Sequence, residues 1–302
     1  MNTNQKVVVV GATGFLGMEI IRLLLDEGYD VKGLIRETSS KEKVDALKES
    51  GVETVVGDMK DPDSLSRAFE VADICISTAS CTFSRQDGDN IESVDHQGQL
   101  NVVDAAKNAG IKKIVFISFN KIDNDFPLQT AKRAVEKAIA DSGMAYTILQ
   151  PTVFMEVWLS APLGFDAANA TATLYGTGQN PITWISYRDV AAFAVEAADN
   201  EISNGRTFEL GGPEQLSPLQ VISIFEEELG CKFSVNNVPV EALQEQKNSA
   251  ADPLSRSFAG LMLGYADGNR IQMEETLNIL PVSMTSVRDY ARSIVPAGEA
   301  VH

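Results

Sequence analysis

The sequence predicts an α/β protein built on a doubly wound parallel sheet with helices on both faces. Four consecutive valines at 7–10 are typical of a strand that is buried on both sides. Glycines at 11, 14 and 17 follow at once and precede a periodic apolar stretch, which predicts a strand, a tight turn and a helix. Short apolar runs then alternate with helix-like segments through the first half of the chain.

The elements of this first half follow from the apolar runs and from helix boundary signals. Asp61 followed by Pro62 is typical of an N-cap and a first helical residue. Glycines stand where four helices are expected to end, at 28, 51, 110 and 143. The predicted strands are 7–10, 31–35, 54–56, 74–77, 114–118 and 146–149, and the predicted helices are 15–27, 41–49, 63–69, 91–109 and 130–141.

The second half is less regular and predicts a smaller, mixed C-terminal lobe. We expect short strands at 171–175, 182–185 and 207–210, and helices at 186–198, at 217–229 after a capping-box pattern that starts at Ser217, and within 239–280. No linker separates the halves. We therefore expect two domains, 1–152 and 153–302, packed over a cleft at the carboxyl ends of the strands, with part of 182–211 returning to the main sheet.

Composition and charge exclude several classes of function. The net charge of −17 argues against binding to nucleic acid or to an anionic membrane surface, and no apolar run is long enough for a membrane span. Three cysteines without paired spacing suit a reducing compartment, and two histidines make a metal site improbable. The polar first six residues do not resemble a secretory leader, so we expect a cytoplasmic protein.

The glycine-rich turn predicts a dinucleotide site. Gly11 permits the tight turn, Gly14 lets the backbone approach a pyrophosphate, and Gly17 lets the helix pack closely on the strand. The start of the helix offers free N–H groups to the phosphates, so Thr13, Phe15 and Leu16 are also expected to contact the cofactor. An ordinary strand-to-helix turn is the plainer alternative.

The residue after the second predicted strand indicates which dinucleotide binds. Arg36 lies about twenty positions past the glycines, where a carboxylate would accept from the ribose 2′-OH of NAD. A guanidinium pairs with a 2′-phosphate instead, so the sequence favours NADP(H). Two alternatives remain open at this stage: Glu37 faces the ribose, or Arg36 is an ordinary solvated surface residue.

The run from Gly11 to Gly17 resembles the short-chain dehydrogenase/reductase superfamily of Rossmann proteins in its extended and atypical branches. That resemblance implies that Asp58 accepts from the adenine amino group and that Met59 covers the ring; Asp58 as a helix cap is the alternative. Small residues at 76–80, among them Thr78 and Ala79, are expected to let the backbone approach the riboses and phosphates.

The superfamily's catalytic pattern is incomplete in this chain. It consists of a serine and then Tyr-x-x-x-Lys, in which the tyrosine is the general acid and the lysine lowers its pKa and holds the nicotinamide ribose. Lys132 stands at the lysine position, but the tyrosine position is occupied by Leu128. Ser118 ends the fifth predicted strand, although Phe119 is the alternative for the serine position.

A lysine without the tyrosine resembles the NmrA-like branch of the superfamily. The runs 145–156 and 184–191 resemble that branch too, with Gln150 in place of its usual arginine, and within the first run Pro151 and Phe154 complete the predicted cofactor contacts. The resemblance implies NADP(H) binding. It leaves the activity open, because the branch includes reductases of quinones, aromatic ethers and dyes as well as redox sensors and assembly factors.

We therefore carry three hypotheses. The first is a reductase that transfers a hydride to a small aromatic, quinone or enone substrate, with Lys132 holding the ribose and an aromatic pocket formed by Phe154, Trp158, Phe165, Tyr175 and Trp184; core packing is the alternative for these five. The second is a non-catalytic NADP(H)-binding sensor with a protein partner, since His96 is a poor substitute acid. The third, a sugar-nucleotide epimerase, is disfavoured by Leu128.

Overall fold

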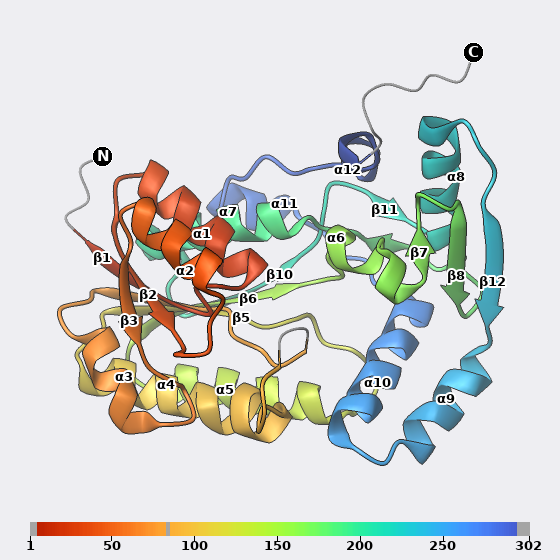
Figure 1. Cartoon of the computed structure of the whole chain (residues 1–302). Coiled ribbons are helices and arrows are strands. Elements are labelled where there is room, and N and C mark those ends of the chain that lie inside the picture. The colour runs from red at the N-terminus through yellow and green to blue at the C-terminus, as the bar shows by residue number, and fades with distance from the viewer. Residues whose placement is uncertain (1–4, 83–84, 295–302) are drawn as a thin grey trace.

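The computed structural model describes residues 5–82 and 85–294, and its centre is a seven-stranded parallel sheet (Figure 1). The strands are β1 Lys6–Val10, β2 Asp30–Ile35, β3 Glu53–Val56, β4 Ile74–Ser77, β5 Lys113–Ile117, β6 Ala145–Pro151 and β10 Arg206–Leu210. Their order is β10-β6-β5-β4-β1-β2-β3. The chain builds outward from β1 to β3 and then resumes on the other side of β1 with β4, so a crevice opens between β1 and β4 at their carboxyl ends.

Two helical layers cover the sheet because its strands are apolar on both faces. The helices are α1 Phe15–Asp26, α2 Lys41–Glu49, α3 Pro62–Phe69, α4 Gln97–Asn108, α5 Pro127–Asp141 and α7 Tyr187–Asp199. Val7 and Val9 face a core shared with α1, α2 and α7, whereas Val8 and Val10 face one shared with α3, α4 and α5 (Figure 1). The predicted doubly wound fold class is confirmed.

The C-terminal lobe has small sheets and several helices, and it lies beside the carboxyl ends of β5 and β6 (Figure 1). The strands are β7 Phe165–Asp166, β8 Thr171–Tyr175, β9 Ile182–Thr183, β11 Gln215–Leu216 and β12 Ser234–Val238. The helices are α6 Met155–Trp158, α8 Pro218–Leu229, α9 Val240–Ser249, α10 Pro253–Asp267 and α12 Val287–Ile294. A further helix, α11 Glu274–Ile279, lies beside α7 and packs on the core of the main sheet (Figure 1). An aromatic core joins the small sheets to α8 and α12.

Most predicted boundaries agree with the structure. Asp61 caps α3 by accepting from the Asp63 N–H, and Ser217 forms the expected capping box with Gln220. Three predictions differ. The helix expected over 130–141 begins earlier, at Pro127. The helix expected over 91–109 begins as one wide π-helical turn, Ile91–His96, and the strand expected over 182–185 has only two residues. In the described residues, no helix is both long enough and apolar enough to span a bilayer.

Candidate functional site

A cavity of about 840 Å³ opens at the carboxyl ends of the central strands, between the sheet and the C-terminal lobe. Its walls include every residue that the sequence predicts for cofactor binding or catalysis except Gly17. They are Gly11, Thr13, Gly14, Phe15, Leu16, Arg36, Asp58, Met59, Thr78, Ala79, Ser118, Lys132, Pro151 and Phe154. The structure therefore gathers residues from the carboxyl ends of six strands, β1 to β6, and from helices α1 and α5 around one space.

The glycine-rich turn approaches β4 so closely that side chains are excluded. Gly11 has a φ of +91°, and a Cβ there would lie 2.6 Å from Oγ1 of Thr78. Gly17 lies behind the turn, where a Cβ would come within 2.1 Å of the Gly11 carbonyl oxygen, so it brings α1 onto the strand rather than lining the cavity. Gly14 is the N-cap of α1, whose first N–H groups therefore point at the cavity.

The end of β4 forms a fixed wall opposite this turn. The Thr78 N–H donates to the Val10 carbonyl at 2.9 Å. The buried Ser77 hydroxyl donates to the Gln99 side chain at 2.8 Å, and Gln99 in turn donates to the Ala79 carbonyl at 2.7 Å. These bonds hold the backbone of 77–79 in place beside the turn.

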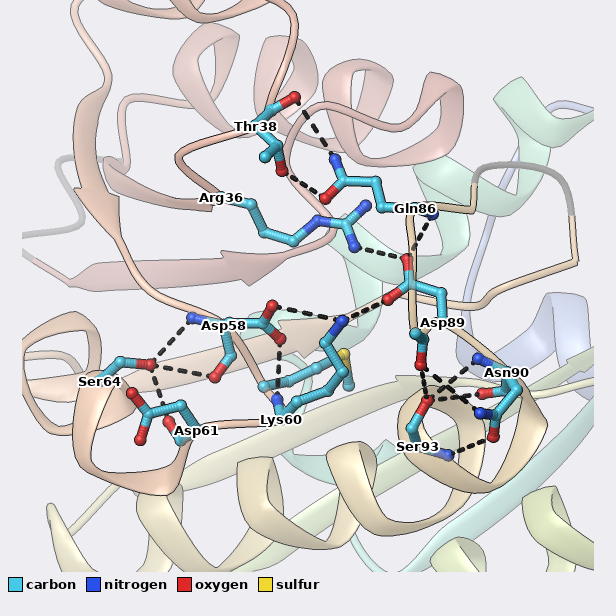
Figure 2. Close-up of polar contacts among 12 residues, drawn as sticks. Arg36, Thr38, Asp58, Lys60, Asp61, Ser64, Gln86, Asp89, Asn90 and Ser93 are labelled. Carbon is cyan, nitrogen blue, oxygen red and sulfur yellow. Dashed lines mark hydrogen bonds and ion pairs between the residues drawn. The ribbon is translucent and has the colours of Figure 1, made fainter.

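Charged side chains gather at the outer end of the cavity, past β2 and β3 (Figure 2). Arg36 reaches across to Asp89, with 2.6 Å between a guanidinium nitrogen and Oδ2 of the carboxylate. Lys60 binds the other oxygen of Asp89, also at 2.6 Å, and lies 3.6 Å from Asp58. Lys43 of α2 lines the same end and donates to the Thr13 carbonyl. Arg36 is thus a paired cation that lines the cavity, with 28% of its side chain exposed.

Asp58 and Met59 lie beside this charged cluster. Asp58 accepts from the Lys60 N–H at 2.9 Å, and its own N–H donates to Ser64. Asp58 does not cap α3, because that role belongs to Asp61. Met59 is 8% exposed, and its side chain packs where a Cβ on Gly98 would otherwise lie. Both residues line the cavity.

Lys132 lies at the inner end of the cavity, almost out of contact with solvent. Its side chain is 5% exposed, and Nζ lies 3.4 Å from the Ile117 carbonyl oxygen and 4.9 Å from the centre of the Phe116 ring. Burial lowers the pKa of this ammonium, and the nearby carboxylate of Asp95 opposes that shift without cancelling it. The group is therefore easier to deprotonate than an exposed lysine.

Asp95 is the partner of Lys132 that sequence reasoning missed. It comes from the π-helical turn, is fully buried, and places Oδ1 3.7 Å from Nζ of Lys132. Its other oxygen accepts from the Cys81 N–H at 3.1 Å, whereas Oδ1 has no hydrogen-bond partner among residues 5–82 and 85–294. A buried carboxylate beside a buried ammonium keeps a balanced charge at the inner end of the cavity.

The tyrosine and serine positions of the catalytic pattern are occupied by one apolar and one polar side chain. Leu128 lines the cavity, is 3% exposed and supplies no proton. Ser118 also lines the cavity, and its buried hydroxyl lacks a hydrogen-bond partner in the described chain. Buried polar atoms are seldom left unpaired, so this hydroxyl is suited to meet a ligand. Gln150, which replaces the branch's usual arginine, donates to Glu136 of α5.

The far part of the cavity is aromatic and apolar. Trp158 stacks on Tyr265 with ring centres 4.9 Å apart and an angle of 12° between the rings. Other apolar lining residues are Phe119, Phe154, Leu163, Phe258, Leu261 and Met262. Of the five aromatics predicted for such a pocket, Phe154 and Trp158 line it. Phe165 and Trp184 pack in the lobe core instead, and Tyr175 bonds to the Leu163 carbonyl.

Known proteins resemble this chain over most of its length. A sequence profile described as the NmrA-like family matches residues 3–280. The photosystem II assembly factor Ycf39 of Synechocystis is 34% identical, over 80% of this chain and 72% of its own, and the NAD(P)H azoreductase of Xenophilus azovorans is 28% identical over 84% of each chain. The NADPH-dependent quinone oxidoreductase QOR2 of Escherichia coli, crystallised with NADPH, shares the fold with a TM-score of 0.77 and 22% identity over 95% of this chain and 99% of its own.

Proposed function

This chain belongs to the NmrA-like family, and from that membership and the site above we propose that it is an NADP(H)-dependent reductase. Its acceptor is a small aromatic, quinone or enone compound. In this proposal residues 1–152 bind the dinucleotide and 153–302 hold the acceptor. The observation that carries it is the cavity that joins Arg36, the glycine-rich turn, Lys132 and an aromatic wall.

The residues present fit an NADP molecule. The close approach of Gly11 to Thr78 makes a backbone cradle that a Cβ would fill. The N-terminus of α1 and Lys43 supply positive charge for phosphates, and Arg36 suits a 2′-phosphate. The unpaired hydroxyl of Ser118 gives a hydrogen-bonding group at the inner end. The name of the azoreductase relative records the use of NAD(P)H.

Lys132 has two proposed roles, binding the nicotinamide ribose and donating a proton. When bound, a reduced nicotinamide supplies the hydride. The ammonium of Lys132 donates to the ribose hydroxyls, and its lowered pKa makes it a better proton donor than an exposed lysine. Leu128 offers no proton, so the acceptor must be one whose reduction gives a stabilised anion. Quinones and related conjugated acceptors meet that condition, and the stacked pair Trp158–Tyr265 suits a flat ring.

The test is NADPH oxidation by the purified protein against quinones, enones and triarylmethane dyes. We expect turnover with at least one acceptor, and we expect Lys132→Met to abolish it. Lys137→Met is the matched control, because Lys137 is on the same helix but 76% exposed. A Lys132→Met protein that keeps full activity removes Lys132 from the mechanism. Melting curves check that each variant is folded.

The cofactor assignment has its own prediction. Arg36→Glu puts a carboxylate where a 2′-phosphate would bind, so NADPH affinity should fall by about a hundredfold while NADH affinity changes little. Fluorescence titration with both cofactors measures this. Equal losses for NADPH and NADH, or no loss for either, contradict the choice of NADP(H).

A second candidate function is a dinucleotide-binding protein without turnover, such as a redox sensor or assembly factor. Leu128 at the proton-donor position and the identity with the assembly factor Ycf39 favour it. This alternative predicts no oxidation of NADPH with any acceptor. It also predicts widely different affinities for NADPH and NADP⁺, because a sensor must tell the two redox states apart. Turnover that depends on Lys132 contradicts it.

A further inference from the structure

The ion pair between Arg36 and Asp89 lies at the place that the proposed function gives to a 2′-phosphate. Asp89 is 53 residues from Arg36 in sequence, yet its carboxylate lies at 2.6 Å from the guanidinium (Figure 2). Both residues line the cavity. Only 1% of the Asp89 side chain is exposed, so its carboxylate is buried among the residues of the site.

Asp89 is held as a phosphate would be held. One oxygen accepts from Arg36 and from the Gln86 N–H at 2.9 Å, and the other accepts from Lys60. Burial alone would raise the pKa of Asp89, but these hydrogen bonds outweigh it and keep the pKa below its usual value. The group is therefore an anion at neutral pH, with two cations and one backbone N–H around it.

The Asp89 carboxylate and a 2′-phosphate cannot both bind Arg36 closely. A 2′-phosphate carries about −1.5 to −2 charges near pH 7, and it would meet the negative carboxylate of Asp89 at Arg36. Like charges at this spacing repel, so one of them must withdraw. The phosphate carries the larger charge and more acceptor oxygens, which favours it for the guanidinium.

We propose that Asp89 is an internal competitor for the 2′-phosphate, occupying Arg36 and Lys60 until NADP(H) displaces it. This inference rests on the proposed binding of NADP(H). Asp89 then sets how strongly the chain prefers NADP(H) over NAD(H), because only the phosphorylated cofactor must displace it. Lys60 is a second cation for the phosphate, in addition to Arg36.

The neighbouring contacts keep such a displacement local. Gln86 is tied to Thr38 through both its side-chain oxygen and its Nε2, so this part of the chain stays attached when Asp89 leaves Arg36 (Figure 2). On the other side, Asn90 and Ser93 form a reciprocal capping box at the start of the π-helical turn. That box anchors the turn carrying Asp95, so movement of Asp89 need not disturb Lys132.

The experiment measures the binding of two fragments by calorimetry, 2′,5′-ADP with the 2′-phosphate and 5′-AMP without it. Asp89→Asn removes the negative charge at nearly constant shape. We expect the substitution to raise the affinity for 2′,5′-ADP by about tenfold and to change the affinity for 5′-AMP by no more than about twofold. Asp87→Asn is the matched control, because it removes the same charge from an exposed residue two positions earlier and should leave both affinities unchanged.

The outcomes separate this inference from the proposed function. If 2′,5′-ADP binds the wild-type chain well and Asp89→Asn leaves its affinity unchanged or weaker, Asp89 merely orients Arg36 and the inference is wrong while the cofactor assignment stands. If neither protein binds 2′,5′-ADP more tightly than 5′-AMP, both the NADP(H) assignment and the inference are wrong.

Hydrogen exchange on the wild-type protein gives a second test that needs no variant. The Gln86 amide donates to Asp89, so displacement should speed its exchange when 2′,5′-ADP is bound but not when 5′-AMP is bound. The Ser93 amide, held by Asn90, should be unaffected. Slower exchange of the Gln86 amide with both ligands overturns the inference.

Discussion

At the scale of single residues, the pair Lys132–Asp95 determines the charge at the inner end of the cavity. Removing two charges from water is expensive, and their attraction offsets this cost only when both partners are present. Nζ and Oδ1 are 3.7 Å apart, too far for a strong hydrogen bond, so Nζ of Lys132, which lines the cavity, keeps capacity for a ligand. Asp95 is therefore a positioning residue that acts through Lys132.

Replacing Asp95 should change the pH dependence of turnover. The carboxylate raises the pKa of Lys132 against the lowering effect of burial. Asp95→Asn removes that opposing effect, so the pKa of Lys132 falls further and the alkaline loss of kcat/KM moves to lower pH. A pH–rate profile from pH 6 to 10 measures the shift. Asp104→Asn, at an exposed position on α4, should leave the profile unchanged; an Asp95→Asn profile that moves to higher pH refutes the role.

The sequence could predict Lys132 but not its partner. Lys132 is predicted because it stands at the lysine position of the superfamily's catalytic pattern, on the helix after the fifth predicted strand. Asp95 is 37 positions earlier and looks like any other acid in a polar helix. Only the π-helical turn directs it inward. Asp89 was missed for the same reason, because its partners lie on loops after β2 and β3 and no local spacing connects them.

At the scale of elements, α10 shapes the acceptor end of the cavity. It packs against the segment between β5 and α5 at two glycines. A Cβ on Gly260 would lie 2.5 Å from the Phe126 ring, and one on Gly264 would lie 2.7 Å from Cγ2 of Ile122. Gly264 and Ile122 both line the cavity. The contact between helix and loop therefore determines how wide the acceptor end is.

Gly264→Ala should alter acceptor binding more than stability. Alanine gains about 1 kcal/mol of helix propensity over glycine, which offsets part of an overpacking cost of about 1–3 kcal/mol. Ile122 must move into the cavity, so the KM for the acceptor should rise severalfold while NADPH affinity is unchanged. Steady-state kinetics and melting curves measure both effects. Arg256→Ala, at an exposed position on α10, is the control; an unchanged acceptor KM contradicts this role for the contact.

Elements built from local signals were predictable, and those built from distant contacts were not. The valine run, the glycine turn and the capping residues Asp61 and Ser217 specify structure within a few positions. The lobe depends on pairings such as β8 with β12, which joins segments about sixty residues apart in a parallel register. Short strands of two residues, such as β9, carry no periodic pattern at all.

At the scale of the whole molecule, the chain's net charge of −17 opposes the approach of an anionic cofactor. At the outer end of the cavity the attraction comes from a few cations, Arg36, Lys43 and Lys60. Two of these already pair with Asp89, and Lys60 also lies 3.6 Å from Asp58, so two carboxylates largely neutralise their field before a ligand arrives. The long-range repulsion therefore exceeds the long-range attraction, and binding relies on short contacts.

This balance predicts an unusual dependence of association on salt. The screening length is about 30 Å at 10 mM salt and about 8 Å at 150 mM, so added salt should remove the repulsion from distant carboxylates while leaving the short contacts in the cavity less affected. The association rate constant of NADPH should thus rise severalfold over this range, whereas electrostatically steered ligands associate more slowly as salt increases. Stopped-flow fluorescence measures it. NADH lacks the 2′-phosphate charge and should show a smaller rise; a rate for NADPH that falls with salt would mean that the local cations, despite their pairing with Asp89, dominate the field around the site.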